Sequence, residues 1–203
     1  MRRRPGARGQ TMVEFSLLLP LFLVVILAIV DFSGYFGARL SVENAARAGA
    51  RLATTTTLAG YTSGTSPQTG SGIISTVVGT AAVASVPSNV DCKWQGTTLS
   101  PTQYPPFQWA NTAKGCIGIW YFELEQNGPP QLCTQFSAAN HAFGAYSGSG
   151  GNTWTAAAPA TGCVAANSDV VVVGVGYNYS PLTPIPALNG LTTYGETQLL
   201  EED

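Results

Sequence analysis

Gly9, Gln10 and Glu14 are the residues whose types and spacing most clearly predict chemistry, and they lie where a basic segment meets a long apolar one. A carboxylate at the membrane edge of an apolar helix is costly, and such groups usually have a function. Gln10 and Glu14 are four residues apart, so they share one face of a helix. If the peptide bond after Gly9 were cut, the new ammonium of Gln10, on this chain or a neighbour, would be a natural partner for the carboxylate. The alternative for Glu14 alone is a side chain that merely reaches the lipid headgroups.

No other group of residues in the sequence predicts catalysis. His141 is the single histidine, and the Gly-x-Ser-x-Gly elbow of many serine hydrolases is absent. Residues 148–151 (Gly-Ser-Gly-Gly) lack the lysine of a phosphate-binding loop. Glu123 and Glu125 could pair as acid and base, although two solvated carboxylates are the commoner explanation. We therefore expect no enzymatic activity, no cofactor and no small-molecule substrate.

The four cysteines, Cys92, Cys116, Cys133 and Cys163, all follow the apolar run. In an oxidising compartment they predict two disulfides, with three possible pairings. Each bridge would add about 3 kcal/mol of stability on the chain-entropy account. The close cysteine spacing of a zinc ribbon is absent, so we predict no metal site. Reduced, buried thiols are the alternative.

The N-terminal segment has the composition of a basic leader followed by a membrane span. The first nine residues contain Arg2, Arg3, Arg4 and Arg8 and no acid. Residues 15–36 are then almost wholly apolar, and about 18 such residues suffice to cross a bilayer as a helix. Because positive charges hold their flank in the cytoplasm, the N-terminus should stay inside and the chain after residue 36 should lie outside.

A cleaved secretory signal peptide is the alternative to this span. Such a peptide needs a small-residue cleavage site just past its apolar core. The nearest such site, residues 48–50 (Ala-Gly-Ala), lies about twenty residues beyond Val30. That distance and the length of the apolar run favour an uncleaved span.

The helix should continue beyond the membrane, from about Thr11 to about Thr55, for about 65 Å at 1.5 Å per residue. Pro20 should bend the span near its inner third. Small residues recur every four positions in the outer half, at Ala45, Gly49 and Ala53, and also at Ala46 and Ala50. Such a strip lets another backbone approach closely, and either the chain's own domain or a neighbouring subunit could occupy it. Glu43 and Arg47 have the spacing of a favourable ion pair.

The part of the chain that follows the helix is acidic. Although the whole chain has a net charge of −2, it contains two lysines and eight acidic residues after Leu52. A nucleic-acid partner requires clustered Lys and Arg, so we expect none.

The predicted fold class is α+β: a long N-terminal transmembrane helix, then an outer domain with a short helix and an antiparallel sheet. Alternation in residues 116–125 predicts a strand with two apolar faces, which should be central in its sheet. The expected elements are a loop at 54–72, a short helix at 73–83, a strand at 90–95, the strand at 116–125, a loop at 147–160 and a strand at 170–179. As domains, we expect a leader at 1–9, the helix at 10–57 with its span at 15–36, a linker at 58–72 and the outer domain at 73–203.

Aromatic residues in the outer domain admit two interpretations. They are Trp94, Tyr104, Phe107, Trp109, Trp120, Tyr121 and Phe122. They could form a sugar-binding or adhesive surface, but such residues more often belong to a core.

Three stretches resemble the TadE-like proteins, pseudopilins or minor pilins of the tight-adherence (Flp) pilus machinery. They are residues 12–20 (Met-Val-Glu-Phe-Ser-Leu-Leu-Leu-Pro), 29–34 (Ile-Val-Asp-Phe-Ser-Gly) and 43–54 (Glu-Asn-Ala-Ala-Arg-Ala-Gly-Ala-Arg-Leu-Ala-Thr). The likeness is close over about the first 57 residues and looser at 170–179, where Pro181 and Pro184 follow a strand. It implies a pilin-like outer domain, cleavage after Gly9 by a prepilin peptidase, and a role for Glu14 in processing or assembly.

The same resemblance implies a bacterial cytoplasmic membrane protein with one span that helps to assemble, prime or cap a pilus. Its partners would be the membrane, the prepilin peptidase, other pilins and the pilus-assembly platform proteins. The alternative function is a membrane-tethered adhesin whose aromatic domain binds a ligand. An anchored envelope enzyme is disfavoured because no catalytic constellation is apparent.

Overall fold

The computed structural model describes residues 7–55, 67–81, 84–94, 98–99, 107–109, 113–123, 129–140, 142–147, 153–156, 170–182 and 191–200. Two helices in these ranges are α1 (Ala7–Thr55) and α2 (Pro67–Thr80). The strands are β1 (Lys93–Trp94), β2 (Phe107–Gln108), β3 (Gly115–Glu123), β4 (Gln131–Ser137), β5 (Ala142–Ser147), β6 (Thr153–Ala156), β7 (Val170–Asn178) and β8 (Thr192–Leu200). The predicted α+β class, a long helix before a short helix and antiparallel strands, is confirmed.

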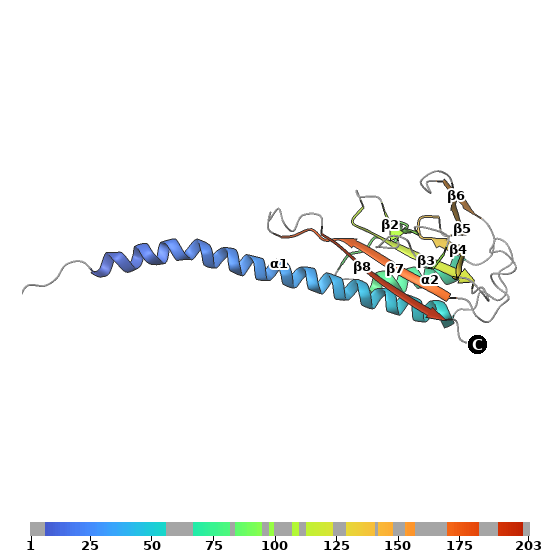
Figure 1. Ribbon diagram of the computed structural model, residues 1–203, viewed down its shortest axis with the longest axis horizontal. Coiled ribbons are helices and arrows are strands. Elements are labelled where there is room, and N and C mark those ends of the chain that lie inside the picture. The colour runs from blue at the N-terminus through green and yellow to red at the C-terminus, as the bar shows by residue number, and fades with distance from the viewer. Residues whose placement is uncertain are drawn as a thin grey trace, which may run out of the picture.

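The helix α1 is the longest element, and it continues through Pro20. Its 49 residues measure about 74 Å at 1.5 Å per residue. The first half projects from the outer domain, whereas the second half lies along it (Figure 1). This division follows the sequence, since large apolar side chains give way to alanine and glycine in the second half. The predicted continuous helix is confirmed, although it already begins at Ala7.

The main sheet has six strands in the order β6-β5-β4-β3-β7-β8, and every neighbouring pair is antiparallel. The strand β3 lies in the interior, paired with β4 on one side and β7 on the other. Its predicted central position is therefore confirmed. The strands β1 and β2 form a separate two-stranded sheet.

The two faces of β3 bury different cores because successive side chains point to opposite faces of a strand. Ile117, Ile119 and Tyr121 belong to the core between the sheet and the helices. Trp120 and Phe122 belong to a second core on the opposite face, with Cys92 and Phe107 among its members.

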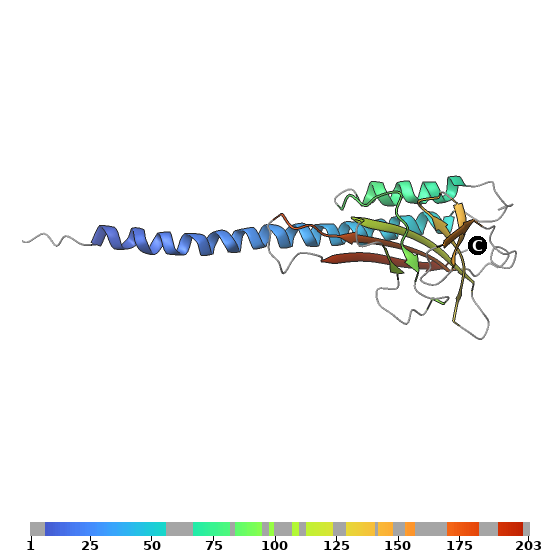
Figure 2. The ribbon, with the colours of Figure 1, turned by 90° about the horizontal axis from the view of Figure 1, so that it is seen from above.

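Both helices lie on one side of the main sheet (Figure 2). The small residues of α1 make this packing possible: a Cβ built on Gly49 would lie 2.5 Å from Val77 Cγ2 of α2 and 3.1 Å from Val173 Cγ1 of β7. Ala45 and Ala53 are completely buried. The small-residue strip is thus occupied by the chain's own domain, which decides between the two possibilities that the sequence left open.

Several predicted boundaries were wrong. The helix α2 starts at Pro67 rather than at residue 73. Part of the expected loop (54–72) and of the expected linker (58–72) is therefore helical. Proline suits the first position of a helix because its backbone angle φ is already fixed near the helical value. The expected loop at 147–160 contains β6, and the strand expected at 90–95 is reduced to β1. Pairing with a neighbouring strand stabilises β6, and this is tertiary context that local propensity does not contain.

Candidate functional site

The expected processing residues lie at the start of α1. The peptide bond between Gly9 and Gln10 falls within the first turn of the helix. Glu14 is exposed, one turn further along, so residues 10 and 14 share a helical face. The main-chain N–H groups of a first helical turn have no partner inside the helix, so this bond lies in the part of α1 that opens most readily.

An exposed apolar belt follows these residues. The large apolar side chains of α1 from Met12 to Leu40 are between 43 and 77 % exposed. The helix is long and apolar enough to cross a membrane, which suggests a single-pass membrane protein. An exposed apolar surface of this extent marks contact with lipid or protein. Pro20 lies within the belt, and a bend of the span at this residue stays a prediction.

Asp31 interrupts the belt and fastens the outer domain to α1. It is only 1 % exposed, and its Oδ1 accepts a hydrogen bond from the main-chain N–H of Leu182 at 2.8 Å. The Tyr179 hydroxyl donates to the main-chain oxygen of Asp31 at 2.9 Å. The Tyr179 ring also meets Tyr35 edge to face, with centroids 5.6 Å apart.

Glycine at position 34 makes this contact possible, because a Cβ there would lie 2.6 Å from the Tyr179 hydroxyl oxygen. Burial raises the pKa of Tyr179 above its usual value, and the Asp31 carboxylate and Tyr177 raise it further. A tyrosine hydroxyl is protonated at neutral pH even at its usual pKa, and this shift further favours the protonated form that donates the hydrogen bond. Sequence patterns do not predict this contact, and the aspartate within an apolar run was its only signal.

Glu43 is paired differently from the prediction. Its Oε1 lies 3.1 Å from Nε of Arg39, one turn before it, rather than near Arg47, one turn after it. Both bases are four residues away, and local spacing alone favours the Glu43–Arg47 order, in which the glutamate comes first. Arg39 and Arg47, together with Tyr35 and the strand residues 192–196, line a cavity of about 330 Å³ beside α1.

A second buried carboxylate, Asp91, organises the turn after β4. Its Oδ2 accepts a hydrogen bond from the Ser137 hydroxyl at 2.6 Å. Its Oδ1 accepts from the main-chain N–H groups of Ala138 and Ala139. These bonds satisfy a buried charge, so Asp91 is a structural residue.

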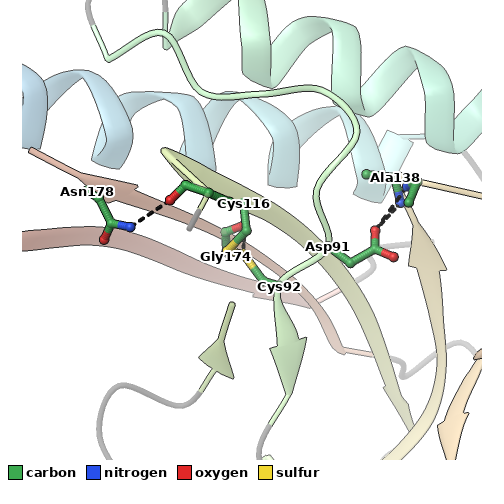
Figure 3. The surroundings of a disulfide bond; sticks show 8 residues. Asp91, Cys92, Cys116, Ala138, Gly174 and Asn178 are labelled. Atoms are coloured by element: carbon green, nitrogen blue, oxygen red, sulfur yellow. Dashed lines mark hydrogen bonds between the residues drawn. A yellow bond between two sulfur atoms is a disulfide. The ribbon is translucent and has the colours of Figure 1, made fainter. Parts of the chain in front are cut away.

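Cys92 and Cys116 form a disulfide with their Cα atoms 5.0 Å apart. It joins the segment before β1 to the central strand β3, and Asp91 lies directly beside it (Figure 3). Cys133 is also disulfide-bonded. Cys163 lies outside the described residues.

The residues weighed for catalysis and ligand binding do not form a site within the described part of the chain. Glu123 is half-buried at the end of β3, whereas Glu125 and His141 lie outside the described residues. No group of three or more His, Cys, Asp or Glu residues that could hold a metal ion occurs in the ranges given above.

The outer-domain aromatic residues that could have formed a binding surface are mostly core residues where the structure describes them. Trp94, Phe107, Trp120, Tyr121 and Phe122 are buried. Trp109 packs against the same core, and Tyr104 lies outside the described residues. For these side chains the core interpretation is confirmed, so they provide no exposed aromatic surface.

Comparison with known proteins identifies one part of the chain. Residues 9–51 match the family model described as TadE-like protein, the family that the sequence resembles. The match begins at Gly9 and ends within the outer half of α1. No curated protein and no solved structure matches the chain.

Proposed function

We propose that this protein is a TadE-like pseudopilin or minor pilin, processed by a prepilin peptidase after Gly9, that assembles, primes or caps a tight-adherence pilus. One observation carries the proposal. The segment that matches the TadE-like family lies in a single helix. The first half of this helix is apolar and exposed, and the second half packs against the folded domain. Such a helix can hold a domain at a membrane and can also pack beside neighbouring helices of the same kind.

Processing would place a new positive charge within reach of Glu14. Cleavage after Gly9 leaves the ammonium of Gln10 one helical turn from the Glu14 carboxylate. A carboxylate is costly in apolar surroundings, by about 3 kcal/mol at the centre of a bilayer, so pairing with the ammonium of a neighbouring chain would favour one arrangement of adjacent helices. This pairing would set the axial register of adjacent helices, while the apolar belt would provide most of the contact area.

The arginine leader supports an orientation with the N-terminus in the cytoplasm. The outer domain would then lie on the oxidising side, where its disulfides are stable. The proposed partners are the prepilin peptidase, other pilins and the assembly platform. The tethered-adhesin alternative relied on an aromatic surface, and the buried aromatic residues remove its main support.

The first experiment determines the intact mass and the N-terminal sequence of the chain from its native membranes. The wild-type chain should start at Gln10, whereas Gly9→Val should keep its leader. Gly37→Val is the matched control, since it adds the same side chain to α1 at a glycine with open space around it; it should also start at Gln10. A wild-type chain that retains its arginines would contradict the processing, and a start near Arg51 would mean that the span is a removed signal.

A second arm of this experiment tests Glu14. Glu14→Ala should still start at Gln10 but should be recovered in the pilus fraction at about one hundredth of the wild-type amount, because the ammonium of the neighbouring chain would be left as an uncompensated buried charge, at a cost of about 3 kcal/mol. Ser16→Ala, an exposed neighbour on the same helix, should assemble normally. Normal assembly of Glu14→Ala would contradict the register role.

A further inference from the structure

The segment that follows β7, residues 179–182, lies against the middle of α1, where the helix leaves the outer domain (Figure 1). Two hydrogen bonds hold it there. The main-chain N–H of Leu182 donates to Asp31 Oδ1 at 2.8 Å, and the Tyr179 hydroxyl donates to the main-chain oxygen of Asp31 at 2.9 Å. The main chain of Leu182 therefore lies within about one helical turn of the level of Asp31 along the helix axis.

Asp31 itself lies inside the apolar belt. On the side of the outer domain the belt continues past it through Phe32 and Phe36, which are 50 % and 54 % exposed. The next charged residue along the chain is Arg39. At 1.5 Å per residue, Phe36 lies about 7.5 Å beyond Asp31 along the helix axis. A membrane that covers the belt as far as Phe36 therefore also reaches Leu182.

The Leu182 side chain points away from the protein. It is 85 % exposed, whereas the most exposed of the large apolar side chains in the belt, Met12, is 77 % exposed. The sequence from Val170 to Gly195 contains no Asp, Glu, Lys or Arg, so no charge near Leu182 along the chain would have to be kept in water. Moving such a side chain from water into lipid is favourable.

The main chain of residues 179–182 suits apolar surroundings. Non-helical main chain is tolerated at membrane depth only where the protein satisfies its polar groups. The Tyr179 N–H donates to the main-chain oxygen of Leu191 at 2.9 Å, the Leu182 N–H donates to Asp31, and Pro181 has no N–H. The same contacts cover the Asp31 carboxylate, which is only 1 % exposed and would be costly in contact with lipid.

We propose that residues 179–182 dip into the membrane leaflet on the side of the outer domain, with the Leu182 side chain among the lipid chains. Tyr35 and Tyr179 then lie near the boundary between lipid and water, where tyrosine is enriched. The outer domain is thus held against the membrane by this segment as well as by α1. That a membrane surrounds the first half of α1 rests on the proposed function, whereas the position of the segment on the helix rests on the contacts with Asp31.

The test adds single tryptophans to the full chain in phosphatidylcholine liposomes whose acyl chains are either plain or brominated. Bromine quenches the fluorescence of tryptophans that contact it, and the wild type in the same liposomes is the baseline. The emission that Leu182→Trp adds should fall by at least about half in brominated lipid, because the side chain lies in the hydrocarbon layer. Since Leu182 is exposed, this substitution should leave the fold intact.

Two matched variants serve as controls. Phe22→Trp replaces an exposed side chain well inside the belt, and its added emission should be quenched wherever the belt is in lipid. Thr155→Trp replaces an exposed residue of β6, at the end of the outer domain away from the belt (Figure 1). Its added emission should be the same in plain and brominated lipid.

Quenching of Phe22→Trp without quenching of Leu182→Trp would overturn the proposal and leave the membrane span standing. Absence of quenching in both variants would contradict the span as well, so the failure of one proposal can be told from the failure of the other. Quenching of Leu182→Trp that falls as more chains are placed in each liposome would assign the segment to a neighbouring copy, and would also overturn the proposal.

Discussion

Two buried carboxylates show how single residues join distant parts of this chain. Asp31 and Asp91 are 1 % and 8 % exposed, and both accept hydrogen bonds from main-chain N–H groups far away in the sequence. Asp31 fastens the segment after β7 to the helix, and Asp91 fastens the turn after β4 to the segment before β1. A buried charge is tolerated only when such bonds satisfy it, so both residues are sensitive positions.

At the residue scale, Asp91→Ala should lower the free energy of unfolding by about 3 kcal/mol, because three donors lose a charged acceptor in a buried place. Urea unfolding of the full chain in detergent, followed by tryptophan fluorescence, measures the effect. The nearby exposed Asn89 provides a control, since Asn89→Ala should change stability by less than about 0.5 kcal/mol. Equal effects of the two substitutions would show that Asp91 is not the organising group.

At the element scale, α1 changes its role along its length. Its first half presents large apolar side chains outward, while its second half is buried against α2, β7 and β8 through alanine and glycine. A helix packs this closely only where side chains are small, because each added carbon must displace a neighbour in a densely packed interior.

Gly49→Ala should therefore destabilise the protein by about 1–3 kcal/mol, the usual cost of overpacking, although glycine to alanine normally stabilises a helix. The new Cβ would lie 2.5 Å from Val77 Cγ2. Gly37→Ala is the same change at an open position of α1, and it should be neutral or stabilising by up to about 1 kcal/mol. Thermal and urea unfolding compare the two variants, and the same sign for both would contradict the packing argument.

At the scale of the whole molecule, the outer domain is a six-stranded sheet with the helices on one face and, on the other, a second core to which β1 and β2 contribute. The Cys92–Cys116 bridge crosses the second core, where it links residues 24 positions apart. The contact at Asp31 lies where the outer domain meets the middle of α1, and it joins residues 151 positions apart along the chain. The bridge therefore holds the outer domain together, and the Asp31 contact ties that domain to a helix that is long and apolar enough to cross a membrane.

Peptide mapping without reduction should recover Cys92 joined to Cys116, and the count of four cysteines then leaves Cys133 to pair with Cys163. Replacing both Cys92 and Cys116 by alanine should lower the free energy of unfolding by about 3 kcal/mol. The wild-type chain unfolded in reducing buffer serves as the reference, and it should lose at least as much. A cystine peptide that links Cys92 to either of the other two cysteines would refute this pairing.

The regular elements could be predicted where one local pattern dominates. Residues 15–36 are almost all apolar, which is the pattern of a membrane-spanning helix. Residues 116–125 alternate between two apolar faces, which is the period of a strand. The strands β2, β4, β5, β6 and β8 were not predicted, since their patterns are short or mixed with polar residues. Their strand conformation depends on the neighbours with which they pair.

By itself, the sequence determined the parts of this protein that depend on neighbouring residues: the apolar belt, the long helix and the central strand with two buried faces. It also carried the TadE-like resemblance, because that motif lies in one continuous helix. Only the tertiary structure decided the Cys92–Cys116 pairing, the role of Asp31 and the position of the cavity between α1 and β8. Each of these joins residues that lie far apart along the chain, and no local period specifies which distant groups will meet.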